Sequence, residues 1–244
     1  MYTAGMEKNK PDAPVFPMRI NRYLAWKKQS TRRGADELIE QGKVFINGKK
    51  AILGDKVNET DLVDVRFRGA QPKYIYYAYN KPKGIVTHGA QGGEEDIEDI
   101  LPLKGVFPIG RLDKDSHGLM ILTNDGRITD RLLNPKYDHE KEYVVKTTAK
   151  LRESFKKIME DGVNIEGYVT KKCKVELLND FTFKIILHEG KKHQIRRMVV
   201  ALRNEVSDLE RIRTSNIHLG NLEPGSYRPI VGAELQTFLK ELGV

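Results

Sequence analysis

Apolar positions recur at helical spacing near the start of this 244-residue chain and at strand spacing over most of the rest. In residues 18–28, Ile20, Tyr23 and Leu24 share one face of a helix, with basic residues between them. A second helix is predicted over residues 32–42, because a Ser-Thr pair precedes it as a cap and a glycine ends it. These patterns predict a pair of amphipathic helices.

A short hairpin completes this first unit. In KVFINGKKAI, three apolar residues form a strand, and Asn47-Gly48 is a strong signal for a tight turn into the next strand. The segment DLVDVRF supplies one more short strand. We therefore predict a small α/β unit over residues 18–68, preceded by a disordered tail at 1–17 and followed by a polar linker at 69–73.

From residue 74 onward, short apolar runs alternate with turn residues. The runs typical of strands are YIYYAYNKP, GIVTH, GVFPIG, GLMILTND, KEYVVKT, KVELL, FTFKIILHEG and IHLGNL. Helical spacing is restricted to about residues 126–133, 151–161, 193–203 and 233–241. Many strands with occasional helices predict an α+β domain over residues 74–244, with a mixed, largely antiparallel sheet.

Charge is distributed unevenly between these two units. The formal net charge is +8, and residues 1–68 carry 14 Lys and Arg against 9 Asp and Glu, whereas residues 69–244 carry 28 against 25. A basic first unit favours a polyanionic partner, because each phosphate that a protein neutralises releases counterions. A basic protein without such a partner would have the same composition, so charge alone leaves the question open.

Several classes of protein are excluded by what the chain lacks. No apolar run is long enough to span a membrane, and residues 1–17 contain no apolar stretch of the kind found in secretory signals. Cys173 is alone and the histidines fall at no ligand-like spacing, so we expect no metal site. No phosphate-cradling loop is present either, and we expect no cofactor and a reducing, cytoplasmic compartment.

The motif GRLDKDSHGLMILTNDG, residues 110–126, is the strongest candidate for chemistry. It places Asp113 on a loop between two apolar strands, with Arg111 and Lys114 beside it. Such a carboxylate would stay ionised at neutral pH and would suit a nucleophile or base that acts on an anionic substrate. An aspartate that caps a turn or pairs with Arg111 is the commoner case, and the residues alone leave both roles open.

Two further motifs combine charge with an aromatic or helical pattern. In DHEKEYVV, residues 138–145, Tyr143 lies on a predicted strand, where a tyrosine is usually packed in the core. In HEGKKHQIRRMVVAL, a strand closes on a glycine and a helix follows, with Lys192, Arg196 and Arg203 near one face. A solvated basic face would give the same pattern, so neither motif identifies a site by itself.

Together these motifs resemble the pseudouridine synthases that modify ribosomal RNA and carry an N-terminal S4 RNA-binding domain. The resemblance extends from Met18 to the C-terminus, and several segments are most similar to the branch of the family that modifies the large ribosomal subunit. It implies that Asp113 is the essential catalytic residue and that Tyr143 stacks on the target base. It also implies that Arg196 is set against Asp113, where its guanidinium would keep the carboxylate ionised and oriented.

The same resemblance suggests residues that support the pocket or bind RNA. Arg111 and Leu219 are the candidates for pocket support, although periodicity alone places Leu219 in the core. TRRGADELIEQGKVFINGK resembles the S4 domain, and NKPKGIVT resembles the family's NKPxG strand. By motif position and charge, the candidate RNA contacts are Arg19, Arg32, Arg33, Lys43, Lys49, Lys81, Lys83 and Lys192.

The resemblance implies a reaction that isomerises uridine to pseudouridine without cofactor, metal or energy source. Asp113 would attack C1′ of the ribose or abstract the 2′ proton, and the freed uracil would turn and rejoin through C5. The expected partner is large-subunit (23S) ribosomal RNA, with transfer RNA as a further candidate, and the expected state is a monomer. The alternatives are a small-subunit (16S) synthase, a non-catalytic RNA-binding or ribosome-assembly factor, and a nucleoside hydrolase.

Overall fold

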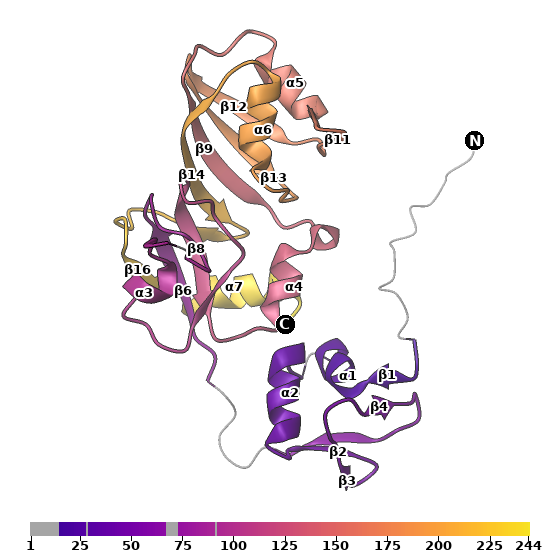
Figure 1. Cartoon of the computed structure of the whole chain (residues 1–244). Coiled ribbons are helices and arrows are strands. Elements are labelled where there is room, and N and C mark those ends of the chain that lie inside the picture. Colours follow the sequence, from indigo (N-terminus) through magenta and orange to yellow (C-terminus); the bar gives the residue numbers. More distant parts are fainter. Residues whose placement is uncertain (1–14, 28, 67–72, 91) are drawn as a thin grey trace, which may run out of the picture. The chain divides into compact units, whose positions relative to one another are not determined.

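The chain divides into two compact units, residues 1–72 and residues 73–244 (Figure 1). The computed structural model describes residues 15–27, 29–66, 73–90 and 92–244. Most of the predicted tail and nearly all of the predicted linker therefore lie outside the described residues. Each unit has a hydrophobic core of its own.

The first unit packs two helices against short strands. Strands β3, β2 and β5 form an antiparallel sheet, and β1 pairs with β4. Its elements are β1 (Met18–Arg19), α1 (Ile20–Trp26), α2 (Arg32–Glu40), β2 (Val44–Ile46), β3 (Lys49–Lys50), β4 (Lys56–Val57) and β5 (Val63–Val65).

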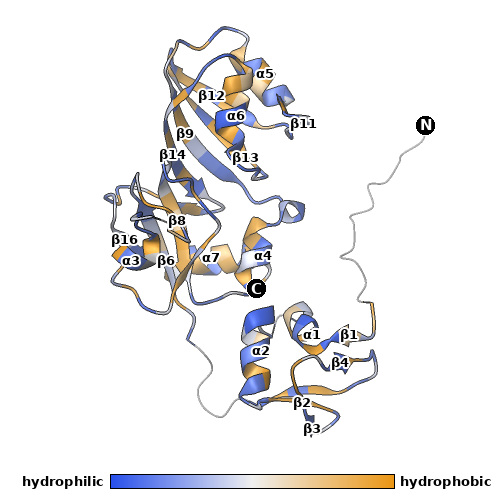
Figure 2. Ribbon diagram, viewed as in Figure 1, coloured by the Kyte–Doolittle hydropathy of each residue, from blue (hydrophilic) through white to orange (hydrophobic). Residues whose placement is uncertain are grey.

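Local chemistry explains where these elements begin and end. The Thr31 hydroxyl accepts a hydrogen bond from the Gly34 amide at 3.0 Å, which caps α2 as the sequence predicted. Ile39 is buried in the small core, while the outer side of α2 is hydrophilic (Figure 2). Asn47 and Gly48 both have positive φ, 49° and 79°, so the predicted tight turn between β2 and β3 is confirmed.

The second unit is built on one large mixed sheet, with the order β12-β13-β9-β14-β8-β6-β16 in the described residues. Neighbours are antiparallel except β14 and β8, which run parallel; β7 also pairs with β8, and β15 with β14. The strands are β6 (Tyr76–Lys81), β7 (Phe107–Ile109), β8 (His117–Thr123), β9 (Lys141–Thr147), β10 (Asn164–Ile165), β11 (Tyr168–Val169), β12 (Lys174–Asn179), β13 (Thr182–Leu187), β14 (Val206–Thr214), β15 (Ile217–His218) and β16 (Tyr227–Pro229).

Helices cover different parts of this sheet (Figure 1). Helices α5 and α6 pack against β9, β12, β13 and β14, whereas α4 and α7 pack against β6, β7 and β8. No helix in the described residues is both long and apolar enough to cross a membrane. The helical elements are α3 (Ile97–Ile100), α4 (Ile128–Leu133), η1 (Pro135–Tyr137), α5 (Phe155–Asp161), α6 (Gln194–Ala201) and α7 (Gly232–Leu242).

Strand β8 is buried on both of its faces. Leu119 and Ile121 point into the cluster formed with α4 and α7, and Met120 and Leu122 point into a separate cluster that contains α3. A continuous apolar run is typical of a strand covered on both sides. The apolar run LMILT after the Asp113 loop was predicted to form a strand, and β8 confirms it.

One predicted strand is absent, and among the strands that were not predicted β14 is the longest. GIVTH forms no strand, because Val86 makes only an isolated bridge with Asp96. Strand β14 was not expected, since VSDLERIRT is too polar to show the alternation of a half-buried strand. It nevertheless lies at the centre of the sheet, where it pairs with β8, β9 and β15.

Candidate active site

The loop between β7 and β8 carries Asp113 and is closed by a short turn. The Ser116 amide donates to the Asp113 carbonyl oxygen at 3.0 Å, so residues 113–116 lead the chain directly into β8. Gly118 has φ +100°, and a Cβ added there would lie 2.4 Å from the carbonyl oxygen of Arg211. Glycine is therefore required for β8 to approach β14 at this point.

The segment that follows β6 fastens this loop from one side. The Thr87 hydroxyl donates to the carbonyl oxygen of Leu112 at 2.7 Å and accepts from the Leu112 amide at 3.1 Å. The Gly84 amide donates to the carbonyl oxygen of Lys114 at 2.9 Å. The segment GIVTH, which was predicted to be a strand, instead forms hydrogen bonds to the backbone on both sides of Asp113.

Lys81 supports the same loop from within the protein. Its side chain is fully buried, and Nζ donates to the carbonyl oxygens of Pro82 and Ser116, each at 2.9 Å. Burial lowers the pKa of Lys81 to about 8, against the opposing attraction of Asp113 and Asp115. The prediction that Lys81 contacts RNA phosphate is therefore wrong, because the ammonium group does not reach the surface.

The Asp113 carboxylate itself remains accessible. Its side chain is 38% exposed, and Nε2 of His193 lies 3.6 Å from its Oδ1. His193 has a left-handed backbone conformation, φ 52°, at the residue directly before α6. Sequence reasoning assigned no role to His193, and only the fold places it beside the candidate catalytic acid.

Arg196 reaches the same loop but not the carboxylate of Asp113. Its Nη2 donates to the carbonyl oxygen of Asp115 at 3.1 Å and to the Ser116 hydroxyl at 3.2 Å, and Nη1 donates to the Val206 carbonyl oxygen at 3.4 Å. Among the residues that the structure describes, no ion pair joins Arg196 to Asp113. The expected ion pair between Arg196 and Asp113 is therefore not formed, because the guanidinium donates instead to Asp115 and Ser116.

Tyr143 lies on β9, at the boundary between two hydrophobic clusters. Its ring packs against the cluster around α5 and α6 and also against the cluster that contains Leu112. In the sheet it is paired with Ile185 on β13 and Arg211 on β14. The half-buried ring thus packs against the cluster to which Leu112, the residue before Asp113, belongs.

The two residues predicted to support the pocket lie in different surroundings. Arg111 is exposed on the Asp113 loop. Leu219 is only 5% exposed and packs in the cluster with Ile217, as its periodicity predicted.

The remaining candidate RNA contacts, apart from Lys81, divide by exposure. Lys83 forms an ion pair with Asp208 beside the Asp113 loop, and Lys43 is half-buried. The exposed candidates are Arg19, Arg32, Arg33, Lys49, Lys83 and Lys192.

A charged cluster next to the loop was not visible in the sequence. Nε2 of His117 lies 3.1 Å from Oδ1 of Asp208, and Lys83 contacts the same carboxylate. Burial raises the pKa of Asp208, but hydrogen bonds from Lys83 and His117 outweigh it and hold the pKa below its usual value. His117 and Asp208 are 91 residues apart in sequence, so no local signal could have joined them. Within the described part of the chain, no group of three or more His, Cys, Asp or Glu side chains could hold a metal ion.

Comparisons with protein families and known proteins identify the family of the chain. The family described as RNA pseudouridylate synthase matches residues 75–201, and the S4 domain matches residues 18–63. The dual-specificity RNA pseudouridine synthase RluF of Escherichia coli (strain K12) is 43% identical over 235 residues, which cover 94% of this chain and 80% of that protein.

Two further relatives cover most of their own length. The ribosomal large subunit pseudouridine synthase B of Bacillus subtilis (strain 168) is 32% identical over 230 residues, 89% of this chain and 94% of that protein. A crystal structure of a pseudouridylate synthase is 29% identical, with a TM-score of 0.67, and covers 92% of this chain and 99% of that chain.

Proposed function

The chain belongs to the RNA pseudouridylate synthase family, and we propose that it converts a uridine of large-subunit ribosomal RNA to pseudouridine. The resemblance seen in the motifs and the predicted order of an S4 domain before the synthase domain are confirmed. The large-subunit enzyme among its relatives supports the choice of RNA. Dual specificity in another relative's name is consistent with a second RNA substrate, for which transfer RNA is our candidate.

One observation carries the assignment of Asp113 as the catalytic acid. An aspartate on a mobile surface loop would sample many orientations, but the Asp113 loop is held by Thr87, Lys81 and Arg196. These contacts bind the backbone on both sides of Asp113 and leave its carboxylate 38% exposed. Because the backbone is fixed and the carboxylate is accessible, Asp113 can be held in one orientation towards a bound substrate.

The carboxylate can start the isomerisation in two ways. In one, an Asp113 oxygen attacks C1′ while the electrons of the glycosidic bond pass to uracil, and C5 of the turned base later displaces the carboxylate. In the other, Asp113 removes the 2′ proton as the glycosidic bond breaks, and returns it when C5 bonds to C1′. In both, the C5 proton is lost and N1 gains one, so no water or cofactor is consumed.

Tyr143 is the residue we assign to the freed base. Its ring packs against two hydrophobic clusters, one of which contains Leu112 of the Asp113 loop, and a half-buried aromatic face suits a base taken out of its helix. Stacking would retain uracil while it turns. Arg196 would then act by holding the Asp115–Ser116 backbone, a positioning role rather than direct contact with the substrate.

The S4 unit supplies contacts that depend little on sequence. Arg32, Arg33 and Lys49 are exposed, and exposed cations at S4 motif positions suit RNA phosphates. Specificity would then arise at the synthase domain, which recognises RNA shape and an unpaired target. An enzyme acting on ribosomal RNA is expected in the cytoplasm, and the monomeric state stays a prediction.

The test is a conservative substitution of the acid with a matched control. Asp113→Asn should abolish release of tritium from RNA labelled at C5 of uridine, while the affinity for large-subunit ribosomal RNA stays within about twofold. Asp115→Asn makes the same chemical change two residues away and should remain active, because Arg196 contacts only the Asp115 backbone. Turnover by Asp113→Asn would contradict the assignment.

A further inference from the structure

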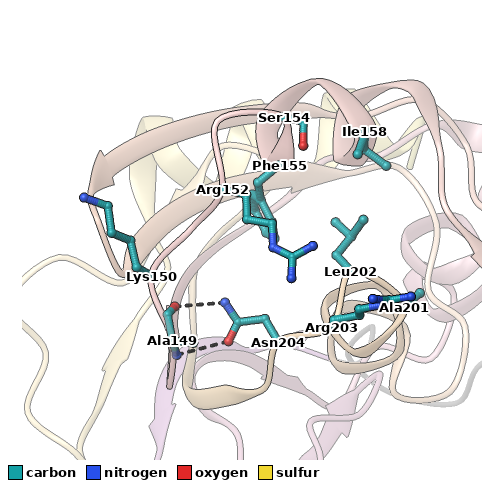
Figure 3. A pocket seen from close by; sticks show the side chains of 10 residues that line it. All are labelled: Ala149, Lys150, Arg152, Ser154, Phe155, Ile158, Ala201, Leu202, Arg203 and Asn204. Atoms are coloured by element: carbon teal, nitrogen blue, oxygen red, sulfur yellow. Dashed lines mark hydrogen bonds between the residues drawn. The ribbon is translucent and has the colours of Figure 1, made fainter.

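A cavity of about 210 Å³ is lined by residues that include Ala201 and Leu202 at the C-terminal end of α6 (Figure 3). Asp113 lies at the opposite end of this helix, beside His193. The cavity is bounded by the loop that follows β9, by α5 and by the C-terminal end of α6. The residues that matter for its chemistry are Lys150, Arg152, Phe155, Ile158, Leu202 and Arg203. None of them belongs to the catalytic loop.

The charge of the cavity is positive. Lys150 lies at the rim and pairs with the exposed Asp180 at 2.8 Å. Within the described residues, neither Arg152 nor Arg203 has a side-chain hydrogen bond or an ion pair, and no acidic residue lines the cavity. Two guanidinium groups without a counterion attract an anion, and phosphate matches their geometry.

An apolar wall faces these cations. Ile158 is 41% exposed although it is aliphatic, Leu202 is half-buried and Phe155 closes the inner side. The Arg152 guanidinium and the Leu202 side chain face the same space (Figure 3). Unpaired bases stack on guanidinium planes and on apolar surfaces, so this pairing of wall and cation suits a nucleobase.

The backbone at Arg203 supports a role for its side chain. Arg203 directly follows Leu202, the C-cap residue of α6, and has φ +60°. Helices commonly end with glycine at this position, because glycine adopts the left-handed conformation without steric cost. An arginine here keeps a guanidinium at the cavity at the expense of backbone strain, and strained residues often mark functional sites.

The cavity is also rigidly connected to the catalytic loop. The Asn204 side chain donates to the carbonyl oxygen of Ala149 at 2.9 Å and accepts from the Ala149 amide at 3.1 Å, which joins two walls of the cavity. Helix α6 has eight residues and spans about 12 Å, with its first end at Asp113 and its last end at the cavity. That distance corresponds to roughly three to four nucleotides of one strand at about 3.4 Å each.

The size of the cavity limits what it can hold. Sites for whole small molecules measure about 300–1,000 Å³. A cavity of about 210 Å³ therefore suits one unit of a polymer whose remainder is bound elsewhere.

We propose that this cavity binds one unpaired nucleotide of the RNA substrate, a few positions from the target uridine. Its base lies against Leu202 and Ile158 beside the Arg152 guanidinium, and its phosphate meets Arg203. The inference rests on the proposed function for the identity of the RNA. It adds a second anchor that places the target relative to Asp113.

Charge-neutralising variants test the phosphate contact. Arg152→Gln with Arg203→Gln should raise the Kd for transcribed large-subunit ribosomal RNA about tenfold and make its salt dependence shallower by about 1. Lys156→Gln with Lys157→Gln removes the same charge from the exposed side of α5 and should change the Kd less than twofold. Equal effects of the two pairs would overturn the proposal.

A second variant separates binding from folding. Arg203→Gly places the favoured residue at a left-handed position, so its Tm should be equal to or above that of the wild type. Its RNA affinity should nevertheless fall severalfold. Unchanged affinity in a fully folded Arg203→Gly protein would remove Arg203 from the interface.

The contact with the base can be tested separately, because its loss should change RNA affinity without changing the salt dependence of binding. Ile158→Ser should weaken RNA binding severalfold with no change in salt dependence, since it removes apolar contact and no charge. An unaltered Kd would overturn the part of the proposal that concerns the base. Absence of pseudouridine from wild-type reactions would instead contradict the proposed function, and the Kd comparisons would still decide whether the cavity binds RNA.

Discussion

The Thr87 hydroxyl is hydrogen-bonded to both backbone groups of Leu112, donating to its carbonyl oxygen at 2.7 Å and accepting from its amide at 3.1 Å. Both residues are buried, so water cannot replace these bonds. Leu112 directly precedes Asp113. A single side chain, 25 residues away in sequence, therefore fixes the backbone that carries the catalytic acid.

Removal of this hydroxyl should affect both stability and turnover. Thr87→Val keeps the shape of the side chain but leaves two buried backbone groups unsatisfied, which should lower the free energy of unfolding by about 2–4 kcal/mol. Turnover should fall because the Asp113 loop loses its clamp. Urea unfolding and C5 tritium release measure the two effects. Thr87→Ser retains the hydroxyl, and a loss as large as that of Thr87→Val would contradict the hydrogen-bonding explanation.

Lys81 should give the protein a specific pH dependence. Its pKa is about 8 in the folded chain against an ordinary value of 10.5, so between these values the unfolded chain binds more protons. The contribution of Lys81 to the free energy of unfolding therefore rises between pH 8 and 10.5, by up to about 3 kcal/mol. It is lost again as the pH falls through this window to 8. The difference in unfolding free energy between wild type and Lys81→Met, measured at pH 7, 9 and 10, should show this trend. Parallel curves would indicate that Lys81 does not titrate there.

Turnover should require the several N–H donors of the Arg196 guanidinium and not only its positive charge. Arg196→Lys cannot reach the Asp115 carbonyl oxygen and the Ser116 hydroxyl together, so single-turnover rates should fall about 10–100-fold. RNA affinity should change little. Arg197→Lys is the control, because Arg197 bonds to Ile165 and Glu166 away from the loop. Equal losses in both variants would argue against a positioning role for Arg196.

Strands β8 and β14 lie so close together at Gly118 that no side chain should fit there. Gly118→Ala combines φ +100° with a Cβ 2.4 Å from the Arg211 carbonyl oxygen and should destabilise the fold by at least about 2 kcal/mol. Gly167→Ala has a similar φ of +87° but open space around its Cβ, and should lose only about 1 kcal/mol. Thermal unfolding of both proteins separates the steric contribution from backbone strain.

The S4 unit should contribute to RNA affinity through its charge and should not affect turnover. Arg32→Ala with Arg33→Ala should weaken binding to ribosomal RNA and make its salt dependence shallower by about 1–2, with turnover at saturating RNA preserved. Binding titrations at several salt concentrations give this slope. An unaltered slope would remove these two arginines from the RNA interface.

Local sequence was sufficient for the elements whose signals lie within a few residues. The Thr31 cap, the Asn47-Gly48 turn and the apolar run of β8 were all predicted, because capping, turn geometry and burial on both faces act on contiguous residues. The motif around Asp113 was likewise identified from its own residues. Strand β14 was missed, since its central place comes from its neighbours in the sheet and not from its polar sequence.

The sequence by itself determined the two-part architecture, the family and the identity of the candidate acid. Only the tertiary structure decided what surrounds that acid: Lys81 is buried beneath the loop, Thr87 clamps it, and Arg196 binds its backbone while His193 faces the carboxylate. The physical reason is distance along the chain. A hydrogen bond across 25 to 81 residues depends on how strands pair and how helices pack, and no periodicity within one segment encodes that.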